Sequence, residues 1–592
     1  MVAALLAACS GDDDAGGSTS PTASEAAPTT AASTSVATSD EVVEGSSVTD
    51  TVDTVDTIDT VADTSSPPSS EPEATYTATI RRDGAGVPHI EADDWGSLGF
   101  GQGWALAEDR ACTLIDQVIK VRGERARWFG AGEDDEHIES DLAYRHLGLR
   151  DEVPTRWSDQ PAQVVDVIDG YVAGFNAQLD DVGADGVSGW CAGEPWVQPI
   201  TTDDLYAVVG DILLLASGNN FISAIATAQP PSDPAPTSEP PETSVDPAAT
   251  SVPVTTGASN GWAFGADRSA SGGGLLLANP HYPWEGELRF WEAHLTIPGE
   301  LDAYGVALSG LPGLQIAFNE DIAWTHTVSA GHRFTLYRYD LAPGDPTSYL
   351  VDGQARPMTP TEITIEVAGA SGAAPTEVTR TLWSTHHGPI INLGPLGWSA
   401  EQAVAIRDAN ADITTVLAQY LAMDTATSMD ELQAAHEEHQ GVPWVNTIAT
   451  SADGRAWYAD TSATPNLSAE ALAAWAAEIE AGGLLALAYN DFGVVLLDGS
   501  NSVYEWVDDP AAPAPGLVPY ADLPQLERTD YVFNANDSYW LAHPDELLTG
   551  YSPLHGEEGT AQSPRTRMNA VLLGESAEPW SIDDVQAAIF SN

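Results

Sequence analysis

Ser259 is the residue around which the sequence first suggests chemistry. It lies in the run Gly257–Gly261 (GASNG), which matches the G-x-S-x-G pattern of a nucleophile elbow. That elbow requires a buried strand before the serine and a helix after it. A proline-rich stretch precedes Ser259 and a strand with a turn is expected to follow it, so the context does not fit an elbow.

A serine that follows a removable segment can act in another way. Residues 229–258 are rich in Pro, Ser, Thr and Glu and predict neither helix nor strand, so they form either a linker or a piece to be removed. If this spacer were cut off before Ser259, the serine would become an N-terminus. Its α-amine, with an ordinary pKa of about 7.7–8.0, could then accept the proton of its own hydroxyl.

Two folded segments flank the spacer. In residues 76–228, alternation predicts strands at 76–80 and 87–91, and helical spacing predicts helices over 98–128 and 162–179. In residues 259–592, helices are expected over 428–439 and 468–481. Strands are expected at 274–278, 289–297, 314–318, 323–328, 362–367, 403–407, 445–450 and 456–458. This pattern indicates an α+β fold in which antiparallel strands predominate.

Several ordered motifs resemble one family. Ser259–Trp262 (SNGW) and Leu275–His281 (LLLANPH) look like the start of the β chain of the penicillin acylase (penicillin amidase) family of N-terminal-nucleophile hydrolases. Arg82–Ile90 (RDGAGVPHI) and Gly101–Arg110 (GQGWALAEDR) resemble its α chain. Pro443–Ala449 (PWVNTIA), His281 and the Cys112/Cys191 pair look most like the acyl-homoserine lactone acylase and aculeacin acylase branch.

The resemblance implies a four-layer αββα fold, with residues 76–228 as a helical α-chain segment and 259–592 as the β-chain segment of one precursor. It also implies self-cleavage between Ala258 and Ser259. The implied catalytic residues are Ser259 as nucleophile, His281 orienting its amine, Val328 as backbone oxyanion donor, Asn536 (or Asn534) as side-chain oxyanion donor, and Arg565 beside that asparagine. Two donors aimed at the tetrahedral oxygen would contribute several kcal/mol.

The sequence also departs from the family pattern. Ala258 stands where many relatives have Gly before the nucleophile. The calcium-binding aspartates of some members are replaced by Gly331–Phe334 (GHRF), so we expect no calcium there and no other cofactor or metal. The chain ends at Asn592, earlier than the family's β chains, which predicts a C-terminally truncated β-chain segment.

Three further patterns predict ordinary structure. His436 and His439, three residues apart on a helix with no evident third ligand, favour a solvated helical face over zinc. His386 and His387 favour a strand end and turn over a ligand pair. Residues 272–274 (GGG) lack the lysine and helix of a phosphate loop and predict a hairpin turn.

The charge balance limits the partners. The chain of 592 residues has 21 Lys and Arg against 88 Asp and Glu, a net charge of −67. Binding to a nucleic acid backbone requires a basic surface and is therefore excluded. Electrostatic binding to an anionic membrane is equally disfavoured. Lys120 is the only lysine, which indicates either a coding bias or adaptation to high salt.

The N-terminal residues point to export. Residues 1–9 (MVAALLAAC) resemble a lipobox remnant ending at Cys9, which would be lipidated and attach the chain to a membrane; an ordinary alanine-rich start is the alternative. Residues 10–75 are acidic and rich in Ser and Thr, which predicts a disordered stalk. Cys112 and Cys191 then form an even pair that an exporting compartment would oxidise, unless both stay buried thiols. We expect a cell-surface or periplasmic lipoprotein, or otherwise a secreted protein.

The function these features favour is that of a self-processing amidohydrolase. It would act on a small-molecule N-acyl amide, releasing a fatty acid from an acyl-homoserine lactone or a lipopeptide. A β-lactam acylase of the penicillin type is the alternative with the same chemistry. A non-catalytic surface-binding relative is the alternative of another class.

Overall fold

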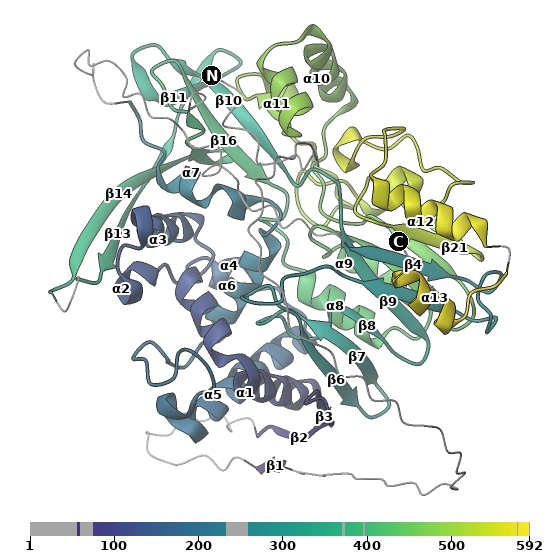
Figure 1. The fold of residues 1–592 in the computed structure, drawn as a ribbon. Helices are drawn as coiled ribbons and strands as arrows, with labels where there is room; N and C mark the ends of the chain where they lie inside the picture. Colours follow the sequence, from purple (N-terminus) through teal and green to yellow (C-terminus); the bar gives the residue numbers. More distant parts are fainter. Residues whose placement is uncertain are drawn as a thin grey trace, which may run out of the picture.

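The computed structural model describes residues 56–59, 75–231, 259–369, 373–394, 397–576 and 578–590. Cys9, most of the expected stalk and nearly all of the expected spacer lie outside the described residues. The described residues form three sheets with helices packed against them (Figure 1). Every strand predicted from alternation is present, and so are the predicted helices.

The largest sheet of the described residues has ten strands. Its neighbouring strands are antiparallel, except that β3 and β6 run parallel. In order across the sheet the strands are β1 (Asp56–Asp59), β2 (Thr77–Arg82), β3 (Pro88–Ala92), β6 (Trp291–Ile297), β7 (Leu301–Ala307), β8 (Ile316–Phe318), β9 (Ile322–Val328), β17 (Val445–Ser451), β18 (Ala456–Ala459) and β20 (Gln525–Arg528).

Strand β1 corrects one expectation. It falls inside residues 10–75, the segment predicted to be disordered, and it pairs antiparallel with β2. The reason is local: β2 would otherwise present an unpaired edge, and the sequence Asp56–Asp59 (DTID) supplies β-branched residues that suit an added strand.

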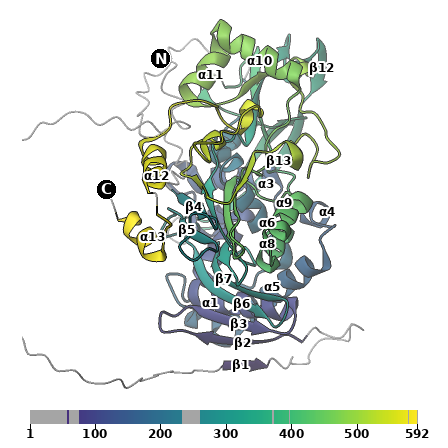
Figure 2. The same cartoon turned by 90° about the vertical axis from the view of Figure 1, so that its right-hand side faces the viewer.

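A three-stranded sheet packs on the ten-stranded one. Its order is β21 (Tyr531–Asn534), β4 (Asn260–Phe264) and β5 (Leu275–Asn279), all antiparallel. Side chains alternate along β4: Ala263 packs in a cluster with residues of the large sheet, whereas Trp262 and Phe264 pack with α12 (Pro564–Glu575) and α13 (Ile582–Ile589). Figure 2 shows α12 and α13 beside β4 and β5. Both faces of β4 are therefore covered.

A separate eight-stranded sheet lies to one side and includes a long β-hairpin, β13 with β14 (Figure 1). In order its strands are β12 (Gln354–Pro357), β11 (Asp345–Val351), β10 (Phe334–Ala342), β16 (Gln402–Asp408), β15 (Gly388–Ile391), β14 (Thr376–Thr385) and β13 (Thr359–Val367), with β19 (Leu496–Asp498) parallel to β10. The turn predicted at His386 and His387 is confirmed between β14 and β15.

The first segment is mainly helical, as predicted. The expected helix over 98–128 is two helices, because Gly123, at φ +60°, breaks it. The helices are α1 (Trp95–Val121), α2 (Arg125–Phe129), α3 (Glu136–Leu147), α4 (Val153–Arg156), α5 (Ala162–Gly186), α6 (Thr202–Leu213) and α7 (Ile222–Ala226). Helix α1 packs on β2 and β3 and, very closely, on α5. A Cβ on Gly103 would lie 2.0 Å from the carbonyl oxygen of Tyr171, so only glycine permits this approach.

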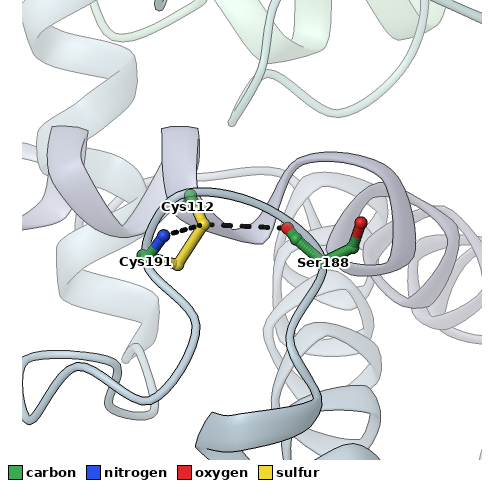
Figure 3. Close-up of a disulfide and its surroundings, with 3 residues drawn as sticks. All are labelled: Cys112, Ser188 and Cys191. Carbon is green, nitrogen blue, oxygen red and sulfur yellow. Dashed lines mark hydrogen bonds between the residues drawn. A yellow bond between two sulfur atoms is a disulfide. The ribbon is translucent and has the colours of Figure 1, made fainter.

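A disulfide joins Cys112 of α1 to Cys191 in the loop after α5 (Figure 3). Of the two alternatives that the sequence left open, the structure therefore has the bridge. The backbone N–H of Cys191 also donates to Cys112 Sγ (3.0 Å). Both cysteines are buried in the first segment, so the bridge does not link this segment to residues 259–592.

Four helices complete the second segment: α8 (Val416–Thr425), α9 (Met429–His439), α10 (Ala469–Ala481) and α11 (Leu484–Phe492). In the part of the chain that the structure describes, no single helix has the length and apolar character needed to cross a membrane. Two bent helix pairs, Thr202–Leu213 with Gly218–Ala226 and Ala469–Ala481 with Leu484–Asn490, meet the criterion by length and composition only.

Candidate active site

The three-stranded sheet brings the predicted site residues together at one end. Ser259 comes directly before β4, His281 shortly after β5, and Asn536 shortly after β21. Because β4 runs antiparallel to both neighbours, its start lies beside their ends: Asn260 is opposite Asn279, and Gly261 is opposite Asn534. Antiparallel pairing thus gathers residues that are far apart in the sequence.

Ser259 is buried, and its Oγ accepts a hydrogen bond from the backbone N–H of His281 (3.3 Å). The imidazole of His281 does not bond Ser259; its Nε2 lies 3.0 Å from Asn279 Oδ1. Burial and the nearby Arg565 lower the pKa of His281, which favours the neutral ring. The prediction that His281 orients the freed α-amine of Ser259 stays a prediction, because in the uncut chain this nitrogen is part of a peptide bond.

Arg565, on the first turn of α12, connects the serine to Asn536. Its Nη1 donates to the carbonyl oxygen of Ser259, and its Nη2 donates to Asn536 Oδ1 (2.9 Å). Burial lowers the pKa of Arg565, although a guanidinium keeps its charge at neutral pH. Since arginine only donates, the side-chain oxygen of Asn536 must face Arg565, and its NH₂ group lies on the other side of the amide.

The side-chain amide of Asn536 lies beside the backbone of Val328, the last residue of β9. Asn536 Nδ2 donates to the carbonyl oxygen of Val328 (3.1 Å). The N–H of Ser329 bonds the carbonyl of Trp444, so by strand alternation the N–H and C=O of Val328 point away from β17. Strand β8 pairs with β9 only as far as Trp324. Val328 also lines the same pocket as Ser259, so the Asn536 amide and the Val328 backbone lie near the serine.

Asn534, the alternative donor in the sequence prediction, has another role here. Its Oδ1 accepts from the hydroxyl of Thr327 (2.7 Å), the amide of Asn446 (3.3 Å) and the backbone N–H of Asn536 (2.7 Å). Its Nδ2 donates to the carbonyl oxygen of Asp537 (2.9 Å). Through these hydrogen bonds Asn534 stabilises the turn that contains Asn536. In this turn Asn536 has φ +70°, a left-handed conformation that asparagine tolerates.

Sequence reasoning missed two members of this network. Asn446, on β17, also donates to Thr327 Oγ1 (3.0 Å), and its own Oδ1 accepts from Tyr458 OH (2.9 Å). Thr327 links β9 to β21 through Asn534. Asn446 stands within the quoted Pro443–Ala449 motif, and that motif was the only signal available.

A mostly apolar pocket opens beside Ser259. It is lined by Ile212, Ser259, Pro280, Tyr282, Phe290, Leu308, Leu311, Gln315, Ile316, His326, Val328, Val416, Tyr420, Pro443, Trp444 and Val445. Burial lowers the pKa of His326 to about 4, so this side chain is neutral at pH 7. The pocket therefore suits an uncharged apolar group.

Two other expectations can be checked. His436 lies on the buried face of α9, not on a solvated face, and its Nδ1 is 2.7 Å from Thr461 Oγ1; the neighbouring glutamates of the helix are the exposed residues. That part of the prediction is wrong, because helical spacing does not show which face meets the core. Residues 272–274 lie in the connection between β4 and β5, which confirms the hairpin turn.

Comparisons with known proteins give matches that cover both folded segments. The family model described as Penicillin amidase matches residues 77–592. The chain is 40% identical over 534 residues to acyl-homoserine lactone acylase PvdQ of Pseudomonas fluorescens (strain Pf0-1), covering 88% of this chain and 66% of that protein. It is 39% identical over 513 residues to aculeacin-A acylase of Actinoplanes utahensis, covering 84% and 63%.

Among solved structures, a thermostable penicillin G acylase from Alcaligenes faecalis aligns with a TM-score of 0.41 and 17% identity over 55% of this chain and 51% of that chain. The chain spans slightly less than two-thirds of the length of the two curated relatives above. The family match itself runs through both segments that flank the spacer, which is the span over which the motifs are distributed. The chain belongs to the penicillin amidase family.

Proposed function

We propose that the chain is an N-acyl amide hydrolase in which Ser259 is an N-terminal nucleophile. The observation that carries this proposal is the convergence of Arg565, Asn536 and Val328 on a buried serine at the wall of an apolar pocket. Such a site combines a nucleophile, donors for a developing oxyanion and an apolar surface for an acyl chain. The catalytic core would have the four-layer αββα arrangement, with the two chains of one precursor associated.

Maturation would come first. Ser259 Oγ attacks the carbonyl carbon of Ala258, the peptide C–N bond breaks, and water hydrolyses the resulting ester. The freed α-amine of Ser259 then serves as the base. A second cut at the other end would remove the rest of the spacer 229–258.

Catalysis would follow the same chemistry. The α-amine takes the proton of Ser259 Oγ while Oγ bonds the substrate carbonyl carbon, and the oxyanion accepts from the Val328 N–H and Asn536 Nδ2. The ammonium returns the proton to the leaving nitrogen as the C–N bond breaks. Water then attacks the acyl ester and releases the carboxylic acid. No step needs a cofactor, and the buried Arg333 guanidinium, 3.4 Å from Asp460, supports our proposal that no calcium binds beside Gly331.

The substrate would be an acyl-homoserine lactone or an acylated lipopeptide. The apolar pocket and the names of the two relatives support this class. A purified enzyme should release fatty acid from dodecanoyl-homoserine lactone faster than phenylacetate from a phenylacetyl amide, as followed by mass spectrometry. The reverse preference would favour a β-lactam acylase of the penicillin type.

The mass of the purified chain tests the nucleophile. We expect wild type to yield two chains, the second starting at Ser259, and Ser259→Ala to remain a single chain. Ser269→Ala is the matched control, since Ser269 is also a buried serine of the same segment, and it should be cut like wild type. An uncut wild type, or cleavage of Ser259→Ala at the same bond, contradicts the proposal. The uncut result would favour a non-catalytic surface-binding relative.

We also propose export as a lipoprotein, on the Cys9 motif alone. The mass of the mature N-terminal peptide should carry a diacylglycerol group, and Cys9→Ser should abolish it. A mature peptide that begins before Cys9, or one that carries no lipid, would contradict this proposal. The protein would then be secreted without a lipid anchor.

A further inference from the structure

His386 and His387 form a cluster with a glutamate far along the chain. The two histidines occupy the turn between β14 and β15, and Glu505 comes 118 residues after His387. His386 Nε2 lies 2.8 Å from Glu505 Oε1, and His387 Nε2 lies 2.8 Å from Glu505 Oε2. One potential ligand atom from each residue lies within 4.8 Å of the others. One carboxylate thus bridges two adjacent imidazoles.

Aromatic residues hold both rings with Nε2 facing the glutamate. The Tyr349 hydroxyl lies 3.0 Å from His386 Nδ1, and the Tyr339 hydroxyl bonds His387 Nδ1. The ring of Tyr337 stacks on His387 at 3.6 Å between centroids. A tyrosine oxygen that accepts an Nδ1–H leaves the Nε2 lone pair free for a metal, which is how outer-sphere oxygens commonly orient histidine ligands.

Two imidazole nitrogens and a carboxylate oxygen are a donor set that suits zinc. His387 is buried, whereas the side chains of His386 and Glu505 are about one-third exposed. An ion could therefore enter from solvent, and a water could occupy a fourth position. The small separations now present fit protons shared between nitrogen and oxygen, which a metal ion would replace.

We propose that His386, His387 and Glu505 bind one zinc ion. The ion would fasten the β14–β15 turn to the segment before Trp506, and water would complete a tetrahedral site. This departs from the sequence prediction of no metal ligand at the histidine pair, because Glu505 is remote in the sequence. The pocket beside these histidines shares no lining residue with the Ser259 pocket, so the site is separate from the proposed hydrolysis.

Zinc titration of the full chain tests this proposal. The full chain would first be stripped of metal with a chelator and dialysed. It would then be titrated with Zn²⁺ in the presence of a chromophoric zinc indicator. We expect wild type to take up one equivalent that Glu505→Gln loses or binds at least about tenfold more weakly. His137→Ala is the control: His137 has a carboxylate neighbour, Glu136 at 3.6 Å, but lies outside the cluster, so its uptake should equal that of wild type.

A second readout excludes a folding defect. Without zinc, Glu505→Gln should have the wild-type circular dichroism spectrum, and zinc should raise the melting temperature of wild type only. If Glu505→Gln does not fold, the partly exposed His386→Gln replaces it. Uptake by the folded variants equal to that of wild type, or no equivalent in wild type beyond weak surface binding, would overturn the proposal.

Discussion

Asn536→Gly separates the chemical role of Asn536 from its backbone role. The wild-type residue has φ +70°, a conformation that glycine adopts without strain. The substitution therefore removes the amide that bonds Arg565 and Val328 while leaving the turn intact. Asn536→Ala removes the same amide but adds a side chain in the left-handed region, at a cost of about 1–2 kcal/mol.

The expected loss in rate follows from the number of donors. If the Asn536 amide and the Val328 N–H share the oxyanion, removing the amide leaves one donor. Loss of one such donor costs about 2.7–4 kcal/mol of transition-state stabilisation, or roughly 10²–10³ in kcat. Because the donor acts on the oxyanion and not on the ground-state amide, KM should change little.

The assay is steady-state release of fatty acid from an acyl-homoserine lactone by matured enzyme. Asn536→Gly and Asn536→Ala should lose similar factors in kcat, while Asn536→Ala should melt at a lower temperature. Gln440→Gly is the control, since Gln440 also has a positive φ (44°) but caps α9, away from Ser259. A variant Asn536→Gly with kcat within about threefold of wild type would refute the assignment of Asn536 as an oxyanion donor.

Three further predictions concern stability. A Cβ on Gly174 would lie 1.9 Å from the carbonyl oxygen of Phe100, so Gly174→Ala should lower the free energy of unfolding in urea by at least about 1–3 kcal/mol. Lys120→Met should cost about 3–5 kcal/mol by the same measurement, because it leaves the buried Asp211 without the charged partner that lies 2.8 Å from it. Burial lowers the pKa of His436 to about 3, so the unfolded chain takes up this proton first as the pH falls below about 6.5. Stability should therefore fall with acidification by up to about 1.4 kcal/mol per pH unit, and urea titrations at pH 7 and 5 should show a smaller fall for His436→Gln; an equal fall would contradict this.

Alternation and helical spacing predicted some of the elements whose two faces differ, although β7, which alternates in the same way as β6, was missed. Strand β6 alternates buried and exposed residues and was predicted, as was α9. Helix α8 was missed because nearly all of its residues are buried, so no apolar stripe is visible. Strand β14 was missed for the opposite reason: most of it is exposed or half-buried, and its threonines pair across the hairpin without an apolar pattern.

The motifs predicted which residues would lie close together, but they did not predict the contacts of these residues. The motifs named Ser259, Val328 and Asn536, and the structure brings these residues near one another because each stands at or near the end of a strand. The sequence could not show that the backbone of His281, and not its ring, bonds Ser259 Oγ. This difference depends on how the chain turns after β5, which places the imidazole of His281 within 3.0 Å of Asn279 Oδ1.

Arg565 makes the site depend on the packing of α12. This one side chain bonds both the carbonyl oxygen of Ser259 and the side chain of Asn536, across 306 residues of sequence in the first case. Its helix is held by the packing of Leu573 against the outer face of β4, where Trp262 and Phe264 lie. A shift of α12 would therefore move Ser259 and Asn536 together. The apolar outer face of a three-stranded sheet thus controls the geometry of the polar residues at its end.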